Sequence, residues 1–438
     1  MKKFVVLAAL FSGVLSSQGA LAKTLEDVLK EKGVITEEDY KEVNKIKPVD
    51  YRLGEGFTFT SADGKFRTSL GSSLQLRYTL LDLDDGNNTA SKQAQDESKF
   101  ELRRIKLYLN GYAYSKDLTY KLQLNLANIN GGATKNGGLL EETWLNYRLL
   151  DELQFRFGQD KVQFGRQFIT SSTAQQFVDQ SVVTNAFAPG YDTGLQLHGK
   201  IAGGFLTYNT AVFGGAGQNT FRATSDNAFN ARLAFNPLGE VKYTESDVEQ
   251  SEKPLLSAGA SFYRNTLNGP EQNTSTATPN QLGFNASKKG WYAIGNPLFA
   301  TTRQISTSES VDYNTAGFDG VFKWQGLSVQ GEYFIGQADG KTSKNALRAQ
   351  GFYAQAGYFV IPKKLELAAR YAYLDPNRDI ANDLQAEATG GVSWYLSGNN
   401  LKLQADYTNV HKQKAISYNS GPNATDDRQV RFQAQLLF

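Results

Sequence analysis

The chain has 438 residues, and its 46 Lys and Arg against 44 Asp and Glu leave a formal net charge of +2. A charge balance so close to neutral argues against nucleic acid as a partner, and the absence of cysteine excludes disulfides and thiolate metal sites. Aromatic residues are plentiful, with 22 Tyr and 27 Phe, although only 40% of the residues are hydrophobic. This combination is typical of half-apolar strands with aromatic girdles.

Residues 1–22 have the pattern of an export signal. Lys2 and Lys3 precede an apolar run over residues 4–15, and the small side chains of residues 20–22 suit cleavage. The run is too short to span a bilayer as a helix. Because the two lysines leave with the signal, the mature chain has a formal net charge of zero. No later stretch has 18 consecutive apolar residues, so we expect no transmembrane helix.

Residues 23–64 are expected to form a periplasmic extension of two short helices and a linker. Gly33 ends the first helix, and Thr36 with Asp39 resembles a capping box for the second, which Pro48 ends. Two roles remain open for this segment, a packing arm between subunits and a solvated spacer.

Apolar and polar residues alternate from Lys65 to Phe438. A strand places alternate side chains on opposite faces, so each segment has one face for lipid and one for water. About 16 segments have the length that a tilted strand needs to cross a bilayer. Their connections are alternately short and long, with residues 237–254 as an exception. We therefore predict an all-β protein, a transmembrane antiparallel β-barrel over residues 65–438.

The last eleven residues, 428–438, show the same alternation and end on Phe438. An edge strand of a soluble β protein is the alternative interpretation of this stretch taken alone. In a barrel, the last strand pairs with the first to remove the open edge. We expect the outer-membrane barrel-assembly machinery to bind this strand, and outer-membrane lipid to surround the barrel.

Three segments resemble the phosphate-selective porin O and P family. They are FELRRIKLYLNGY at 100–112, FRFGQDKVQFG at 155–165 and FAPGYDTG at 187–194. The resemblance covers residues 65–438. It implies an outer-membrane homotrimer of a Gram-negative bacterium, with about 16 strands per barrel and the loop near 162–190 folded inward to narrow the pore.

The polar face of each strand supplies the candidate pore lining. Alternation turns Arg104 inward and Arg103 outward. The candidate anion-binding residues are Arg67, Arg77, Arg104, Lys106, Lys121, Arg156, Lys161, Arg166 and Arg232. The candidate constriction residues in the loop are Ser171, Ser172, Thr173 and Asp179. Cations in a narrow channel raise the local concentration of anions.

The function expected from these residues is passive diffusion of small anions or other small solutes, without catalysis, cofactor or metal. The loop has Arg166 as its one base, which favours a broad anion channel over phosphate specificity. Three alternatives stay open: a general porin without selectivity, an outer-membrane hydrolase, and a barrel scaffold around a partner. His198 faces inward, but no G-x-S-x-G or H-E-x-x-H motif accompanies it.

Overall fold

The chain divides into two units, Met1–Pro48 and Val49–Phe438. The predicted export signal lies outside the described residues, and so does most of the predicted helical extension, of which residues 29–31 and 37–38 are helical. Within the part of the chain that is described, no helix is long and apolar enough to cross a bilayer. The computed structural model describes residues 29–34, 36–38, 48–87, 96–128, 139–220, 222, 225–267, 310–414 and 423–438.

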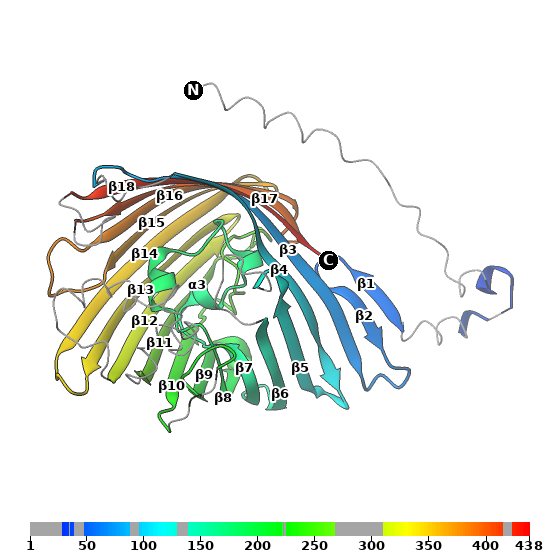
Figure 1. Cartoon of the computed structure of the whole chain (residues 1–438). Helices are drawn as coiled ribbons and strands as arrows, with labels where there is room; N and C mark the ends of the chain where they lie inside the picture. The colour runs from blue at the N-terminus through cyan, green and yellow to red at the C-terminus, as the bar shows by residue number, and fades with distance from the viewer. Residues whose placement is uncertain are drawn as a thin grey trace. The chain divides into compact units, whose positions relative to one another are not determined.

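Sixteen antiparallel strands form the closed barrel wall of the second unit (Figure 1). Each strand from β3 to β17 pairs with the next, and β18 pairs with β3, which confirms the predicted fold class and strand number. The strands are β3 (Arg67–Asp82), β4 (Glu97–Ala113), β5 (Ser115–Asn125), β6 (Leu140–Leu150), β7 (Leu153–Lys161), β8 (Tyr191–Ile201), β9 (Leu206–Phe213), β10 (Ala228–Phe235), β11 (Leu255–Leu267), β12 (Val311–Trp324), β13 (Leu327–Gly340), β14 (Ala346–Ile361), β15 (Leu365–Asp375), β16 (Gln385–Ser397), β17 (Leu401–Lys412) and β18 (Thr425–Leu437).

A short hairpin precedes the barrel, where the sequence had led us to expect only linker. Its strands are β1 (Val49–Arg52) and β2 (Gly56–Thr60), and β2 pairs with the first four residues of β3. Strand β18 covers the same edge of β3 only as far as Ser73, and the main chain of Phe438 adds two hydrogen bonds to Ser72. The hairpin therefore covers the part of this edge that β18 leaves open, and unpaired edge groups are costly.

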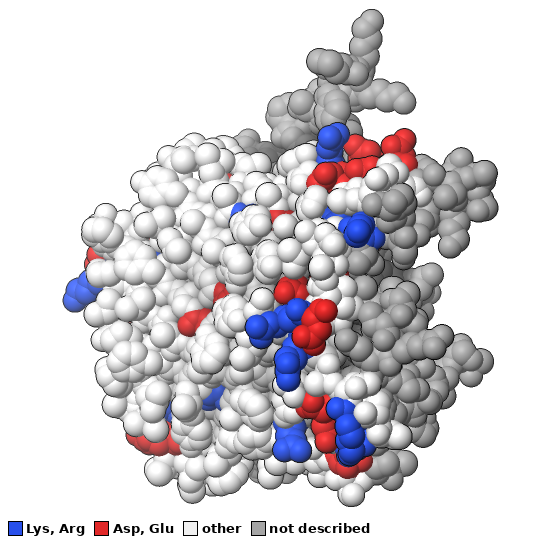
Figure 2. All heavy atoms as spheres, turned by 90° about the vertical axis from the view of Figure 1, so that its left-hand side faces the viewer, with Lys and Arg blue, Asp and Glu red and all other residues white. Residues whose placement is uncertain are grey.

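Burial follows the predicted alternation along most strands. In β3, Gln75 and Arg77 are 1% and 6% exposed, whereas Leu76 between them is 46% exposed. In β18, Arg431 and Gln433 are likewise buried and Phe432 is exposed. Figure 2 shows one face of the molecule, on which most spheres are white and the charged residues gather in a few groups. An apolar outside and a polar inside suit lipid and water, respectively.

The connections at one end of the barrel are short, except for one. Between β12 and β13, the turn consists of Gln325 and Gly326, whose φ values of 47° and 85° are those of a two-residue hairpin turn. At the same end, residues 236–254 connect β10 to β11 and are much longer. Their length has a structural reason, because they fold back toward the barrel interior and contact the loop described next.

Candidate pore

The loop of residues 162–190, between β7 and β8, lies inside the barrel (Figure 1). It contains the short helices α3 (Arg166–Ile169), η3 (Ser172–Ala174) and α4 (Val182–Phe187). The hydroxyl of Ser181 accepts a hydrogen bond from the Thr184 N–H and caps α4. Because a buried loop needs partners for its main-chain groups, its contacts with the wall decide whether it can stay there.

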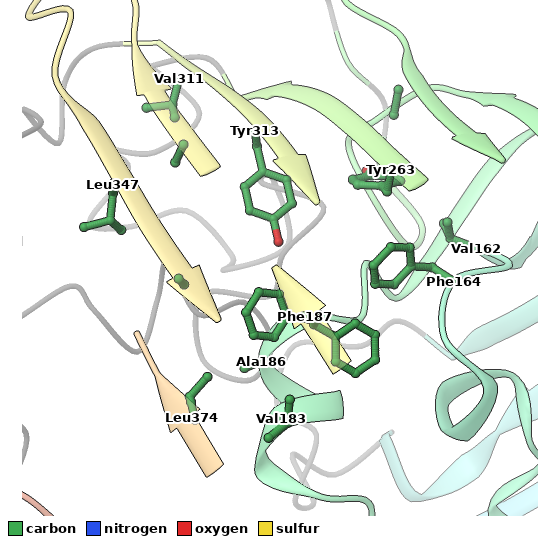
Figure 3. Packing of buried hydrophobic residues seen from close by; sticks show 14 of the residues in the cluster. Val162, Phe164, Val183, Ala186, Phe187, Tyr263, Val311, Tyr313, Leu347 and Leu374 are labelled. Carbon is green, nitrogen blue, oxygen red and sulfur yellow. The ribbon is translucent and has the colours of Figure 1, made fainter. Parts of the chain in front are cut away.

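Apolar side chains fix one side of the loop to the wall. The Phe187 ring stacks on Phe334 of β13, with centroids 5.5 Å apart, and the Phe164 ring lies 5.6 Å from Phe334. Figure 3 shows these loop residues facing Tyr263 and Tyr313, which come from β11 and β12. Over β9 to β15 the inward face is thus partly apolar, contrary to the polar-inward rule. Full burial of one such side chain contributes roughly 1.5–3 kcal/mol.

Buried carboxylates of the wall also hold the loop, through its main-chain N–H groups. Glu332 accepts hydrogen bonds from the main-chain N–H groups of Arg166 at 2.7 Å and Gln167 at 2.5 Å. Asp406 accepts one from the Val178 N–H at 3.0 Å. Hydrogen bonds to carboxylates are stronger than those between neutral groups, so β13 and β17 both anchor the loop.

The long turn of residues 236–254 meets the loop from the other end of the barrel. Glu245 accepts hydrogen bonds from the Gln176 N–H at 2.7 Å and from Gln167 Nε2 at 2.9 Å, and its own N–H donates to the Ala174 carbonyl. The Arg166 guanidinium donates to the carbonyls of Val241 and Lys242. Loop and turn together contact the inner wall from β10 to β18 and reach β3 and β4, and an open space remains beside β3 to β7.

A cavity of about 590 Å³ lies between the loop tip and the wall of β3 to β7. It has basic, acidic and aromatic side chains on the wall side and hydroxyls on the loop side. The lining residues include Lys106, Tyr108, Lys121, Glu142, Trp144, Arg156, Asp160, Lys161, Ser171, Ser172 and Thr173.

The bases of this wall are paired with acids. Lys106 Nζ lies 2.6 Å from Glu141, Lys121 contacts Glu142, and Arg156 Nη1 lies 2.6 Å from Asp160. The three basic side chains keep 12%, 26% and 21% of their surface exposed. They therefore reach the water of the cavity although each has a counter-ion.

A cluster of three arginines surrounds Asp179 of the loop. Arg77 Nη1 and Arg103 Nη2 donate to Asp179 Oδ2 at 3.0 and 3.3 Å, and Arg104 Nη2 lies 3.6 Å from Oδ1. The expected outward orientation of Arg103 is wrong. The register of β3 against β4 shifts between Gln75 and Leu76, so Arg103 and Arg104 both fall opposite this step. A β-bulge of this kind breaks the period of two and turns both arginines inward.

Three other bases predicted for the pore hold the loop and the wall together. Lys161 Nζ donates to the carbonyls of residues 168–170, at the end of α3. Arg232 forms two hydrogen bonds to Asp319, at 2.6 and 3.0 Å, and is 4% exposed. Arg166 is 1% exposed, and its guanidinium stacks over the Tyr243 ring at 4.7 Å.

The remaining predicted residues lie at the barrel end and the loop tip. Arg67 begins β3, opposite Tyr112 of β4. The carbonyls of Ser172 and Thr173 accept hydrogen bonds from Gln75 of β3 and Gln435 of β18, respectively. The Ser171 hydroxyl bonds to the Thr173 hydroxyl. The tip is therefore held where β18 closes onto β3.

Arg370 and Arg431 also reach this region; alternation turns both inward, although they are not among the candidate anion-binding residues. The Arg370 guanidinium donates to the Asp179 carbonyl at 2.9 Å, and Arg431 forms two bonds to Asp406. Their inward positions on alternating strands are the pattern from which the sequence could have indicated them. Their closeness to Asp179 depends on the path of the loop.

His198 has an ordinary hydrogen-bond partner, since its Nε2 lies 2.7 Å from Asn146 Oδ1. In the described residues, no group of three or more His, Asp or Glu side chains is arranged to hold a metal ion.

A closed barrel with an apolar outside and a charged, partly filled interior defines the class of outer-membrane channels. The family model "Phosphate-selective porin O and P" matches residues 74–438. The chain belongs to this family and is an outer-membrane porin, which confirms the resemblance. Family and fold indicate a channel rather than an enzyme.

Two similar proteins match over most of the chain. An uncharacterized protein of Aquifex aeolicus is 23% identical over 434 residues, which cover 92% of this chain and 93% of that protein. Porin O of Pseudomonas aeruginosa is 24% identical over 426 residues, covering 86% and 90%.

Solved structures share the fold. The anion-selective porin from Comamonas acidovorans has a TM-score of 0.54 at 11% identity, covering 84% of this chain and 99% of that one. The channel DcaP of Acinetobacter baumannii has a TM-score of 0.52 at 14% identity, covering 87% and 99%. At these identities the likeness supports the barrel fold alone.

Proposed function

We propose that this porin prefers small anions, which diffuse between the loop tip and the wall of β3 to β7. The observation that carries the proposal is the cluster around Asp179, where Arg77, Arg103 and Arg104 share one carboxylate. The Nε and Nη1 of Arg103 and the Nε of Arg77 are buried without a hydrogen-bond partner in the described residues. Three guanidinium groups against one carboxylate leave a net positive charge here, and such a charge raises the local concentration of anions.

A series of bases continues from this cluster into the cavity. Lys106 follows Arg104 on the same face of β4, and Lys121 and Arg156 follow on β5 and β7. An anion can exchange part of its hydration shell for these donors one after another. None of them needs to hold it tightly, because each also has an acid beside it.

Broad anion passage fits the loop better than phosphate specificity. Arg166, the one base of residues 162–190, is buried and donates to main-chain carbonyls. The loop tip lines the cavity with the uncharged residues Ser171, Ser172 and Thr173 instead. We assign these three residues and Asp179 to the constriction.

A general porin without selectivity is the second candidate. The pairing of Lys106, Lys121 and Arg156 with acids favours it, because paired charges create a weaker field along the pore. The three arginines around the single carboxylate of Asp179 favour the anion-preferring porin over the non-selective one.

The test is the reversal potential of the purified protein in a planar bilayer under a KCl gradient. We expect the sign of an anion-selective channel. A cation-selective sign would overturn the proposal, and a potential near zero would support the general porin. Titrating phosphate into KCl then separates a broad channel, which shows little block, from a phosphate-specific one.

Assembly is the second part of the proposal. OmpT of Vibrio cholerae, a structural neighbour with a TM-score of 0.50, was solved in a trimer form. We propose that this porin is also a homotrimer in the outer membrane, assembled by machinery that binds the strand ending in Phe438. Chemical crosslinking in detergent, with three chains per particle as the expected result, checks the oligomeric state.

A further inference from the structure

Two buried carboxylates in an outer loop have no adequate partner. Asp375 ends β15, and Asp383 lies in the connection to β16. They are 9% and 1% exposed. No hydrogen bond of good geometry reaches either carboxylate oxygen of Asp383, or Oδ1 of Asp375, among the described residues; a nearby donor is the main-chain N–H of Asn377. Burial of a charged group without a partner is strongly unfavourable, so such a pair calls for an explanation.

The loop holds the two carboxylates near one point. The main-chain N–H of Asn377 interacts with both carboxylates, and the Asn377 side chain is fully buried. Asn377 Oδ1 accepts a hydrogen bond from the Asp379 N–H at 3.1 Å. The Arg378 N–H donates to the Arg348 carbonyl at 2.9 Å, which fixes the loop to β14. The carboxylates are therefore held in place by a folded loop.

The groups nearby compensate only part of this charge. The Arg378 side chain is exposed, and Asp379 adds another negative charge. Asp375 Oδ2 receives one long hydrogen bond, from Gln350 Nε2 at 3.4 Å. The two carboxylates repel each other, and burial with this repulsion raises the pKa of Asp383 to about 7. The site thus has an excess of negative charge and free oxygen ligands.

We propose that Asp375 and Asp383 bind a calcium ion, with water and loop oxygens completing its coordination. Ca²⁺ takes six to eight oxygen ligands in flexible geometry and accepts carboxylates in one-oxygen or two-oxygen mode. Mg²⁺ requires a near-ideal octahedron, which an irregular loop rarely supplies. With two carboxylates, the expected affinity is that of extracellular calcium modules, with a dissociation constant of about 10⁻⁴–10⁻³ M.

A second acidic loop shows the contrast. Residues 82–88 have the composition of a calcium loop, but the central carboxylate, that of Asp84, has hydrogen-bond donors from the protein, and Asp82 and Asp85 are not buried. Asp84 accepts hydrogen bonds from the N–H groups of Gly86 and Asp426, and Asp427 accepts one from the Asp84 N–H. Acidic composition alone therefore does not select the site; unpartnered buried oxygens do.

The test is calorimetric titration of Ca²⁺ into the full-length porin, purified in detergent, freed of lipopolysaccharide and treated with chelator. We expect one Ca²⁺ per chain. Asp383→Asn and Asp375→Asn should each weaken binding about tenfold or more. Asp379→Asn, which removes the same charge from an exposed position of the same loop, should bind as wild type does.

Two results would overturn the site: no binding by wild type at millimolar Ca²⁺, or equal binding by all four proteins. Without binding by wild type, the buried Asp383 would be explained as a protonated acid. Equal binding by all four proteins would mean that the ion binds elsewhere on the chain. Channel conductance and the heat-dependent mobility of the barrel on gels confirm that the Asn variants are folded. These controls do not depend on ion selectivity, so a failure here leaves the proposed function standing.

Discussion

Neutralising Asp179 and neutralising Arg104 should shift ion selectivity in opposite directions. Both side chains lie inside the barrel and keep some accessible surface, 18% for Asp179 and 16% for Arg104. An ion passing about 7 Å from either charge interacts with it by roughly 0.3–0.6 kcal/mol, for a dielectric constant near that of water and screening at about 0.1 M salt. Anions and cations change oppositely, so the permeability ratio should change about three- to eightfold.

The measurement is the reversal potential of Asp179→Asn and Arg104→Gln in planar bilayers. Asp179→Asn should raise the anion preference, and Arg104→Gln should lower it. Arg148→Gln is the matched control, because Arg148 is paired with Asp117 and Asp151 at the barrel end. Shifts of equal sign, or a shift in the control alone, would refute the assignment of the cluster to the ion path. Single-channel conductance in concentrated salt, where electrostatic effects are screened, reports whether the loop has stayed in place.

Three further outcomes follow from the packing and charges. Phe187→Ala removes a fully buried ring that stacks on Phe334 and should destabilise the docked position of the loop by about 3–5 kcal/mol. Single-channel recordings should become noisier because the loop then moves in the pore. Phe318→Ala, on the outer face of the barrel, should leave the recordings unchanged. Burial and the charge of Asp375 raise the pKa of Asp383 to about 7, above its ordinary value of 3.8. Ca²⁺ must displace this proton, so calcium binding should be about tenfold weaker at pH 6 than at pH 8; pH-independent affinity would contradict the ligand role. Deleting residues 49–60 exposes the edge of β3, and we expect a lower denaturation temperature with unchanged conductance.

Period-two patterning predicted the barrel correctly because each strand meets lipid on one side and water on the other. The same rule placed Arg104, Lys106 and Lys121 inside, where the structure has them. It failed at Arg103, since one β-bulge reverses the side of a residue without changing the composition around it. It also gave no warning of the apolar inner wall at Tyr263 and Tyr313, which contact each other across 50 residues of chain and belong to one buried cluster with Phe164 and Phe187 of the loop.

The sequence by itself determined the wall of this protein, because the faces of a strand are set by local alternation against two solvents. Only the tertiary structure decided the interior. The route of residues 162–190, their contact with residues 236–254 and the sharing of Asp179 by three arginines are all contacts between distant segments. Such contacts depend on how the loop packs within the closed barrel, and no periodic pattern along the chain records that packing.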